Sequence, residues 1–115
     1  MLAAPPPFPT PTQAHLDEAV RRIVAAVDPE RIIVFGSFAR GEARPGSDLD
    51  LLVVLKFEGS HHRKMGEVGA LLSGLDVPKD VLVVTPADVE RSMDRWDSVI
   101  KTACVEGVTV YARTP

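Results

Sequence analysis

Two short segments within residues 36–51 carry the side chains best suited to chemistry. Gly36 and Ser37 form a turn directly after a short apolar run, and Asp48 and Asp50 stand one residue apart at the start of another apolar run. A glycine-serine turn can cradle a phosphate group, and a pair of carboxylates can hold a divalent metal ion. Together they indicate transfer of a group from a metal-bound nucleoside triphosphate.

The two aspartates alternate with Leu49 and Leu51. In a strand, residues two apart project from the same face, with Cα atoms roughly 6.5–7 Å apart. Both carboxylates can therefore converge on one metal ion, or on two ions about 3.5–4 Å apart, and such oxygen ligands suit Mg²⁺. A role as simple capping or turn residues is the alternative, but two charges leading into an apolar strand require a partner.

Asp80 opens a further strand candidate over residues 80–85. If that strand lies beside the one expected over residues 48–57, a third carboxylate joins the pair. It can then bind metal or deprotonate an attacking hydroxyl. Spacing alone gives equal weight to a structural role for Asp80 as a turn residue.

The Gly36-Ser37 turn is a weak signal when taken alone. The free amides at a helix start and the Ser37 hydroxyl can donate to phosphate oxygens, and glycine permits a close approach. Most glycine-serine pairs are only tight turns, however, and the Gly-Lys-Ser/Thr ending of a Walker loop is missing here.

The loop between the two segments contributes two arginines and a serine. Arg40 is the preferred candidate for neutralising triphosphate charge, because a glycine follows it; Arg44 is the second. The alternative for Arg40 is a solvated side chain or an ion pair with Glu42. Ser47 either orients Asp48 by a hydrogen bond or bonds the local backbone.

Periodicity predicts the elements that position these residues. Helices and strands alternate along the chain, which favours a layered α/β arrangement with the reactive residues at strand ends and turns. Helices are expected over residues 12–27 and 37–40, after the break at residues 59–60 up to about residue 73, and over residues 86–106, the last as one helix or as two with a kink near Trp96. Strands are expected over residues 31–35, 48–57, 80–85 and 108–112.

Composition sets the class of protein. The chain has 115 residues, 45% hydrophobic and 25% charged, which predicts one globular domain over residues 13–115 after a proline-rich, flexible arm over residues 1–12. The net charge of −3 argues against strong nucleic-acid binding. The single cysteine, the lack of a signal peptide and the lack of a membrane-length apolar run indicate a cytoplasmic protein.

Other conspicuous residues receive structural interpretations. His61 and His62 are adjacent and do not share a helix face, so a solvated loop is favoured over a metal pair. Cys104 is expected to pack in the C-terminal helix without a nearby basic partner. Met93 and Trp96 suit packing in the core or at an interface.

The spacing Gly36-Ser37-x₂-Arg40-Gly41-x₅-Ser47-Asp48-x-Asp50-Leu51 resembles the signature of the minimal nucleotidyltransferases in the DNA polymerase beta superfamily. The resemblance implies a mixed β-sheet backed by helices (an α+β fold) and transfer of a nucleoside monophosphate from ATP or another nucleoside triphosphate to a hydroxyl. It assigns two Mg²⁺ ions to Asp48, Asp50 and Asp80, and the triphosphate to Gly36 and Ser37.

Stand-alone bacterial proteins of this kind resemble antitoxins that adenylylate a helical HEPN toxin. The resemblance therefore implies a HEPN-type partner protein that supplies the acceptor hydroxyl, and a homo-oligomer is a further expectation. The alternative is a non-catalytic, nucleotide-binding antitoxin that blocks its partner sterically. A third interpretation, a small-molecule transferase, requires an acceptor pocket that the sequence does not locate.

Overall fold

The computed structural model describes residues 8–114, so most of the predicted proline-rich arm lies outside the described residues. At the end of that arm, Pro11 is buried and the carbonyl of Pro9 accepts a hydrogen bond of 3.5 Å from the Gly46 amide. In chain order the elements are α1 (Gln13–Val27), β1 (Arg31–Phe35), α2 (Gly36–Ala39), β2 (Leu49–Val54), α3 (His61–Ala70), β3 (Lys79–Val84), α4 (Pro86–Ser92), α5 (Val99–Glu106) and β4 (Val108–Ala112).

The four strands form one mixed sheet in the order β3-β2-β1-β4. β1 pairs antiparallel with β2 and β4, whereas β2 and β3 run parallel. The parallel pair is joined through α3, as a crossover connection requires. The expected mixed sheet backed by helices is confirmed, with β2 in a central position and β4 at an edge.

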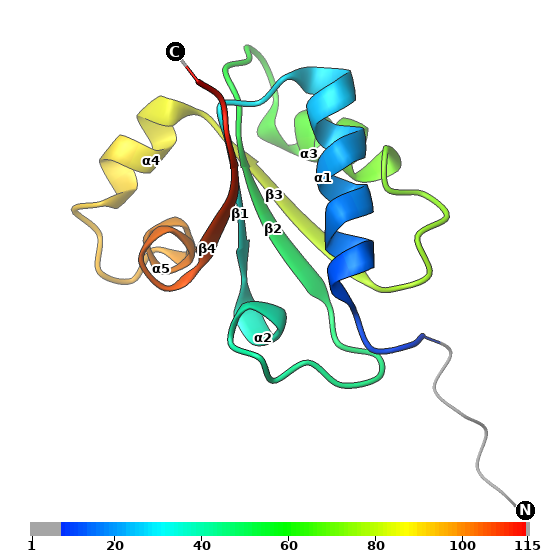
Figure 1. Ribbon diagram of the computed structural model, residues 1–115. Helices are drawn as coiled ribbons and strands as arrows, with labels where there is room; N and C mark the ends of the chain where they lie inside the picture. The colour runs from blue at the N-terminus through cyan, green and yellow to red at the C-terminus, as the bar shows by residue number, and fades with distance from the viewer. Residues whose placement is uncertain (1–7, 115) are drawn as a thin grey trace, which may run out of the picture.

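Helices cover both faces of the sheet (Figure 1). On one face α1 and α3 bury Leu16, Ile23 and Val68 against the inward residues of β1 and β2. On the other face α4 and α5 pack against Ile33 and Leu52 of the same strands. β2 is therefore apolar on both faces, because both of its faces are covered.

The C-terminal helical region consists of two helices. α4 ends at Ser92, and the hydroxyl of Ser98 starts α5 by accepting hydrogen bonds from the amides of Ile100 and Lys101, at 3.2 and 3.3 Å. Trp96 lies in the connection between them and is 88% exposed. Packing of Trp96 in the core is thus wrong, and only the interface interpretation is left.

Three further expectations are corrected. Asp48 precedes β2, which is shorter than the predicted strand over residues 48–57. His61 and His62 belong to the first turn of α3 rather than to a loop, and His61 Nε2 lies 2.6 Å from Asp88 Oδ2. Cys104 does have a basic neighbour, since Arg31 Nη2 donates to its Sγ at 3.7 Å. The packing of α5 against β1, which sequence periodicity does not specify, produces this last contact.

Candidate functional site

The turn between β1 and α2 places Gly36 directly against Asp50. Gly36 has φ +74°, a left-handed conformation that L side chains rarely adopt, and a Cβ at this position would overlap Oδ2 of Asp50. The register explains the contact, since Phe35 at the end of β1 is the Cα partner of Asp50 on β2. Only glycine fits here, so the turn expected to bind phosphate lies in direct contact with Asp50, one of the two predicted carboxylates.

Asp80 lies beside Asp50 across the parallel strand pair. The two residues are direct Cα partners in the β2–β3 register. Neighbouring strands lie about 4.8 Å apart, and paired residues project from the same face of a sheet. Leu52 and Leu82, two residues further along, pack on the α4–α5 side, so both carboxylates face that side. The sequence expectation that β3 would bring Asp80 to the pair is confirmed.

The charges of the two neighbouring aspartates, Asp48 and Asp80, both act on Asp50. Partial burial, together with the charges of Asp48 and Asp80, raises the pKa of Asp50 to about 6, and the charge of Arg40 opposes this rise. Asp48 and Asp80 are exposed and Asp50 is half-buried. The site is therefore a cluster of carboxylates at one end of the sheet, and two of its three members are exposed to solvent.

This donor set fits a magnesium ion that is shared with a substrate. Among residues 8–114, no group of three or more His, Cys, Asp or Glu side chains is arranged to hold a metal ion by itself. Mg²⁺, however, is commonly bound through one or two carboxylates together with substrate phosphates and water. Asp48, Asp50 and Asp80 offer only hard oxygen donors, and a cation would relieve the mutual repulsion that raises the pKa of Asp50.

The residues of the turn after β1 and of the loop before β2 make mainly local contacts. Arg40 Nε lies 2.6 Å from Glu42 Oε1, so the predicted alternative of an ion pair is present, while the Arg40 charge still acts on Asp50. Ser47 Oγ accepts a hydrogen bond of 2.9 Å from the Arg44 amide, which is the local-backbone alternative. Ser37 closes the loop, since its carbonyl accepts from the Glu42 amide at 2.9 Å.

Sequence reasoning did not identify Phe35 as part of the site. Its side chain is half-buried and packs with the α4–α5 cluster, and its backbone pairs with Asp50. The available signal was its place as the last residue of the strand before Gly36. Because Phe35 is paired with Asp50, the next residue, Gly36, lies beside the Asp50 carboxylate.

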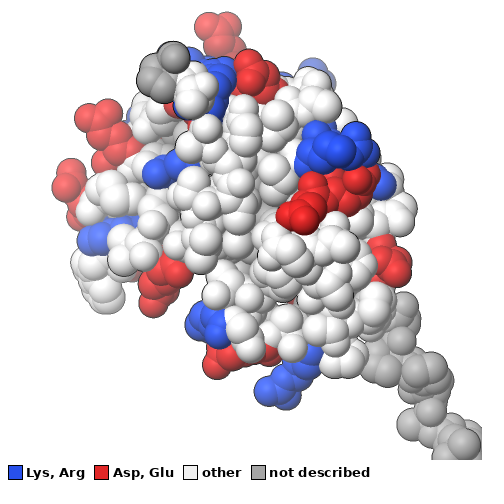
Figure 2. Space-filling view, in the orientation of Figure 1, with Lys and Arg blue, Asp and Glu red and all other residues white. Residues whose placement is uncertain are grey.

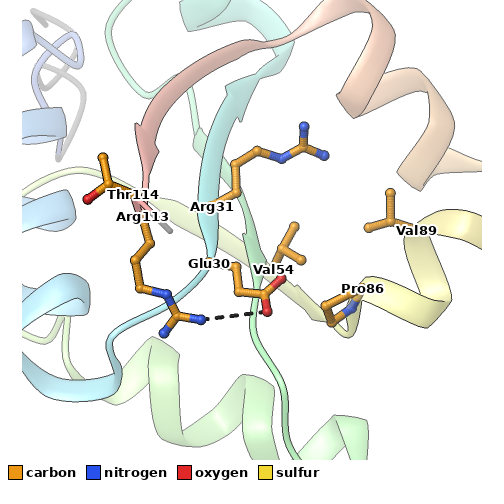
Figure 3. Close-up of a pocket in the computed structure, with 7 residues that line it drawn as sticks. All are labelled: Glu30, Arg31, Val54, Pro86, Val89, Arg113 and Thr114. Atoms are coloured by element: carbon orange, nitrogen blue, oxygen red, sulfur yellow. Dashed lines mark ion pairs between the residues drawn. The ribbon is translucent and has the colours of Figure 1, made fainter.

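A cavity of about 410 Å³ lies beside the start of β1 and the end of β2 (Figure 3). Asp50 pairs with the other end of β1, so the cavity and the carboxylates lie at opposite ends of the sheet. Glu30, Arg31 and Val54, from the start of β1 and the end of β2, line it together with residues of α4 and the C-terminal segment. Arg31 and Arg113 point away from each other, and Arg113 Nη2 lies 3.6 Å from Glu30 Oε1. The two guanidinium groups therefore do not converge on one anion.

Comparison with known proteins agrees with the geometry. The nucleotidyltransferase domain family matches residues 16–103, a span that contains all of the site described above. The chain therefore belongs to the nucleotidyltransferase domain family. No curated protein is significantly similar to the chain.

A solved structure shares the fold. A candidate nucleotidyltransferase from Sulfolobus solfataricus superposes with a TM-score of 0.53 and 21% sequence identity, covering 90% of this chain and 91% of that one. At this identity the likeness shows the fold alone. No helix among the described residues has the length and hydrophobicity needed to cross a membrane.

Proposed function

We propose that the protein is a Mg²⁺-dependent nucleotidyltransferase that moves AMP from ATP to a hydroxyl group of a partner protein. The observation that carries the proposal is that β2, β3 and the turn after β1 meet at one place. Asp50 on β2 is paired with Asp80 on β3, and the Asp50 carboxylate fills the space where a side chain at Gly36 would lie. A phosphate turn placed against a carboxylate cluster is suited to the reacting end of a nucleoside triphosphate.

Each residue has a role that its position allows. Asp48 and Asp50 would hold two Mg²⁺ ions together with the triphosphate, and Asp80 would complete the set beside them. The ions, when bound, neutralise phosphate charge and polarise the α-phosphate. Gly36 and Ser37 would bind the phosphate tail through backbone amides and the Ser37 hydroxyl. Arg40 lies where its charge can stabilise the leaving pyrophosphate.

Asp80 is suited to receive the proton of the acceptor hydroxyl. It is exposed at the start of the edge strand β3, so an incoming acceptor can reach it from solvent. The acceptor oxygen would attack the α-phosphorus, the bond to the bridging oxygen would break, and pyrophosphate would leave in line. The proton passes from the hydroxyl to the Asp80 carboxylate.

A protein acceptor is supported by the surface on the same side of the sheet. α4 and α5 cover the face on which Asp50 and Asp80 project, and Trp96 between these helices is 88% exposed. Exposed tryptophan is enriched at the centres of protein interfaces. By the family resemblance, the partner is a helical HEPN-type toxin, and the modification would silence it, as expected of an antitoxin.

The test is incubation with Mg²⁺, ATP and the product of a neighbouring HEPN-type gene, followed by intact-mass measurement of that product. We expect a mass increase of one AMP, lost in Asp48→Asn and unchanged in Asp17→Asn, an exposed aspartate on α1. No increase with any nucleoside triphosphate would contradict the proposal. If Asp50→Asn neutralised the toxin as well as the wild type, steric blocking would replace catalysis as the function.

A further inference from the structure

We propose that a groove beside the outer edge of β3 binds the acceptor protein, by holding an apolar side chain that lies next to the hydroxyl to be modified. The groove has a volume of about 570 Å³ and is formed by α3, β3 and the α4–α5 region. This inference rests on the proposed function, and it adds which part of the acceptor the transferase recognises.

The groove begins one side-chain step from Asp80. Leu82 lines the groove and lies two residues after Asp80 on β3. Residues two apart project from the same face of a strand, with Cα atoms about 6.5–7 Å apart. Val84, which also lines the groove, is one further step along the same strand. A ligand in the groove can therefore present a neighbouring group to the Asp80 carboxylate.

The direction of the reaction favours the acceptor as the occupant of this groove. An in-line displacement places the attacking oxygen opposite the leaving pyrophosphate. In the proposed function the pyrophosphate end lies at Gly36 and Ser37, directly after β1, and the carboxylates lie on β2 and β3. The strand order is β3-β2-β1-β4, so the side opposite Gly36 is the outer side of β3. The groove lies on that side.

The lining of the groove suits an apolar side chain. Met65 from α3, Leu82 from β3 and Ile100 from α5 contribute apolar surface, and all three are half-buried. Ligand sites commonly measure about 300–1,000 Å³ and combine apolar walls with a few polar groups. The step from Asp80 to Leu82 matches two side chains on one face of the acceptor, two residues apart in an extended segment or three to four apart on a helix.

The rim of the groove carries charges of both signs. Asp88 Oδ2 lies 2.6 Å from His61 Nε2, and Asp88 also pairs with Arg91, so this carboxylate holds two rim side chains in place. Arg95 and Asp94 add one exposed charge of each sign. Because the charges of the rim balance, the acceptor is selected by its apolar side chain and not by its net charge.

Trp96 extends the same surface, since it follows Arg95 of the rim and is 88% exposed. A second uncharged surface lies elsewhere: Figure 2 shows that the face with β4 in front is mainly uncharged in its middle, with charged groups around it. Two strands separate β4 from β3, which puts β4 about 14 Å from the strand of Asp80. The groove, by contrast, adjoins Asp80, so it is the better place for an acceptor.

The test compares acceptor use and nucleotide binding in groove variants. Met65→Gln keeps the side-chain length but places an amide in the groove, whereas Met65→Leu keeps the apolar surface. With the product of the neighbouring HEPN-type gene as acceptor, we expect kcat/KM to fall about tenfold or more in Met65→Gln and to stay near the wild-type value in Met65→Leu. Affinity for a fluorescent ATP analogue with Mg²⁺ should not change. Ala70→Gln, exposed on α3 outside the groove, is the matched control.

A second pair of variants tests another wall of the groove. Ile100→Thr should lower kcat/KM for the acceptor, and Ile100→Val should keep it near the wild-type value. Circular dichroism checks that every variant is folded. Tandem mass spectrometry of the modified acceptor locates the hydroxyl and the apolar residue beside it. Replacing that residue by alanine should cause a loss similar to that in Met65→Gln, and combining the two changes should add little further.

The outcomes separate this inference from the proposed function. No AMP transfer by the wild type overturns both. Transfer that is equally efficient in wild type and in folded Met65→Gln and Ile100→Thr overturns this inference alone, as does a modified hydroxyl without an apolar neighbour. A loss of affinity for the ATP analogue in these variants also overturns it, because the groove would then hold the nucleoside.

Discussion

Gly36 and Asp50 constrain each other at the level of single residues. The Asp50 carboxylate occupies the space that a side chain at position 36 would need, and the backbone of Gly36 is left-handed. The sequence indicated both residues by type and spacing. Their contact was not predictable, because it depends on the register that places Phe35 opposite Asp50.

The effect of a side chain at position 36 can be separated from backbone strain. Gly36→Ala and Gly41→Ala both place alanine at φ +74°, but nothing lies within 4 Å of a Cβ at Gly41. Each should lose about 1–2 kcal/mol of unfolding free energy from the backbone, and Gly36→Ala should lose about 1–3 kcal/mol more from overlap. Urea titrations measure this difference.

Binding of a fluorescent ATP analogue gives a second measurement on the same pair. We expect affinity to fall at least tenfold in Gly36→Ala and to stay near the wild-type value in Gly41→Ala, because only the first disturbs Asp50. Equal losses of stability and of binding in the two variants would show that the Gly36–Asp50 contact has no special role.

At the level of elements, helix starts were the most predictable feature. Thr12 and Thr85 cap α1 and α4, and Thr85 is followed by proline at the first helical position, so both starts were readable from the sequence. The break between α4 and α5 was less clear, because no glycine or proline separates them. In the structure Ser98 caps the start of a second helix, α5. Local sequence preference alone does not decide between one helix and two.

The cap of α4 makes a measurable contribution to stability. Asp88 Oδ2 accepts from the Thr85 amide at 2.8 Å, and Thr85 Oγ1 accepts from the Asp88 amide at 3.1 Å. Thr85→Ala should cost about 1 kcal/mol of unfolding free energy at pH 7, whereas Thr85→Ser should cost only a few tenths. Chemical denaturation of the three proteins compares them. If Thr85→Ser lost as much unfolding free energy as Thr85→Ala, the capping hydrogen bond would not be the cause of the loss.

The same cap should depend on pH. Partial burial tends to raise the pKa of Asp88, but hydrogen bonds from Thr85 and His61 outweigh it and lower this pKa to about 2. A carboxyl group with a lowered folded-state pKa stabilises above its unfolded value and loses that contribution in acid. The stability difference between wild type and Asp88→Asn should therefore be present at pH 7 and fade between about pH 4 and pH 2. A difference that is constant over this range would contradict the assignment.

Trp96 illustrates where residue type misleads about burial. A large aromatic in a helical pattern suits a core, yet the connection between α4 and α5 leaves it 88% exposed. Trp96→Ala should change the unfolding free energy by less than about 0.5 kcal/mol, whereas Leu51→Ala in the buried strand should cost about 2–5 kcal/mol. Thermal and urea denaturation measure both. A core-sized loss in Trp96→Ala would mean that the residue packs against the domain.

For the whole molecule, the sheet is covered by helices on both faces, and this arrangement could be predicted from the sequence only in part. The apolar patterns of β1 and β2 predict burial, and the alternation of elements predicts an α/β arrangement. The order β3-β2-β1-β4 depends on contacts between distant segments, which periodicity does not encode. That order decides which carboxylates meet at the open end and which edge stays free.

The carboxylate cluster should lower the free energy of unfolding of the whole domain. The pH dependence of that free energy measures the size of the effect. Burial, with the charges of Asp48 and Asp80, raises the folded-state pKa of Asp50 from 3.8 to about 6. The folded state therefore binds more protons than the unfolded chain between these values, so stability falls as pH rises through this window and the cost is complete above about pH 6. Asp50→Asn removes the negative charge at position 50, and therefore also the loss of stability that this charge causes at high pH.

We expect Asp50→Asn to be more stable than wild type by about 1–2 kcal/mol at pH 8, after allowance for solvent screening, and equal to it below about pH 4. Urea denaturation at a series of pH values, with Asp17→Asn as the exposed control on α1, measures the difference. Excess Mg²⁺ at pH 8 should narrow the gap by stabilising only the wild type, since a bound cation offsets the repulsion. A gain that persisted unchanged at pH 4 would have to come from packing, and the three aspartates would then not form the coupled cluster on which the catalytic proposal depends.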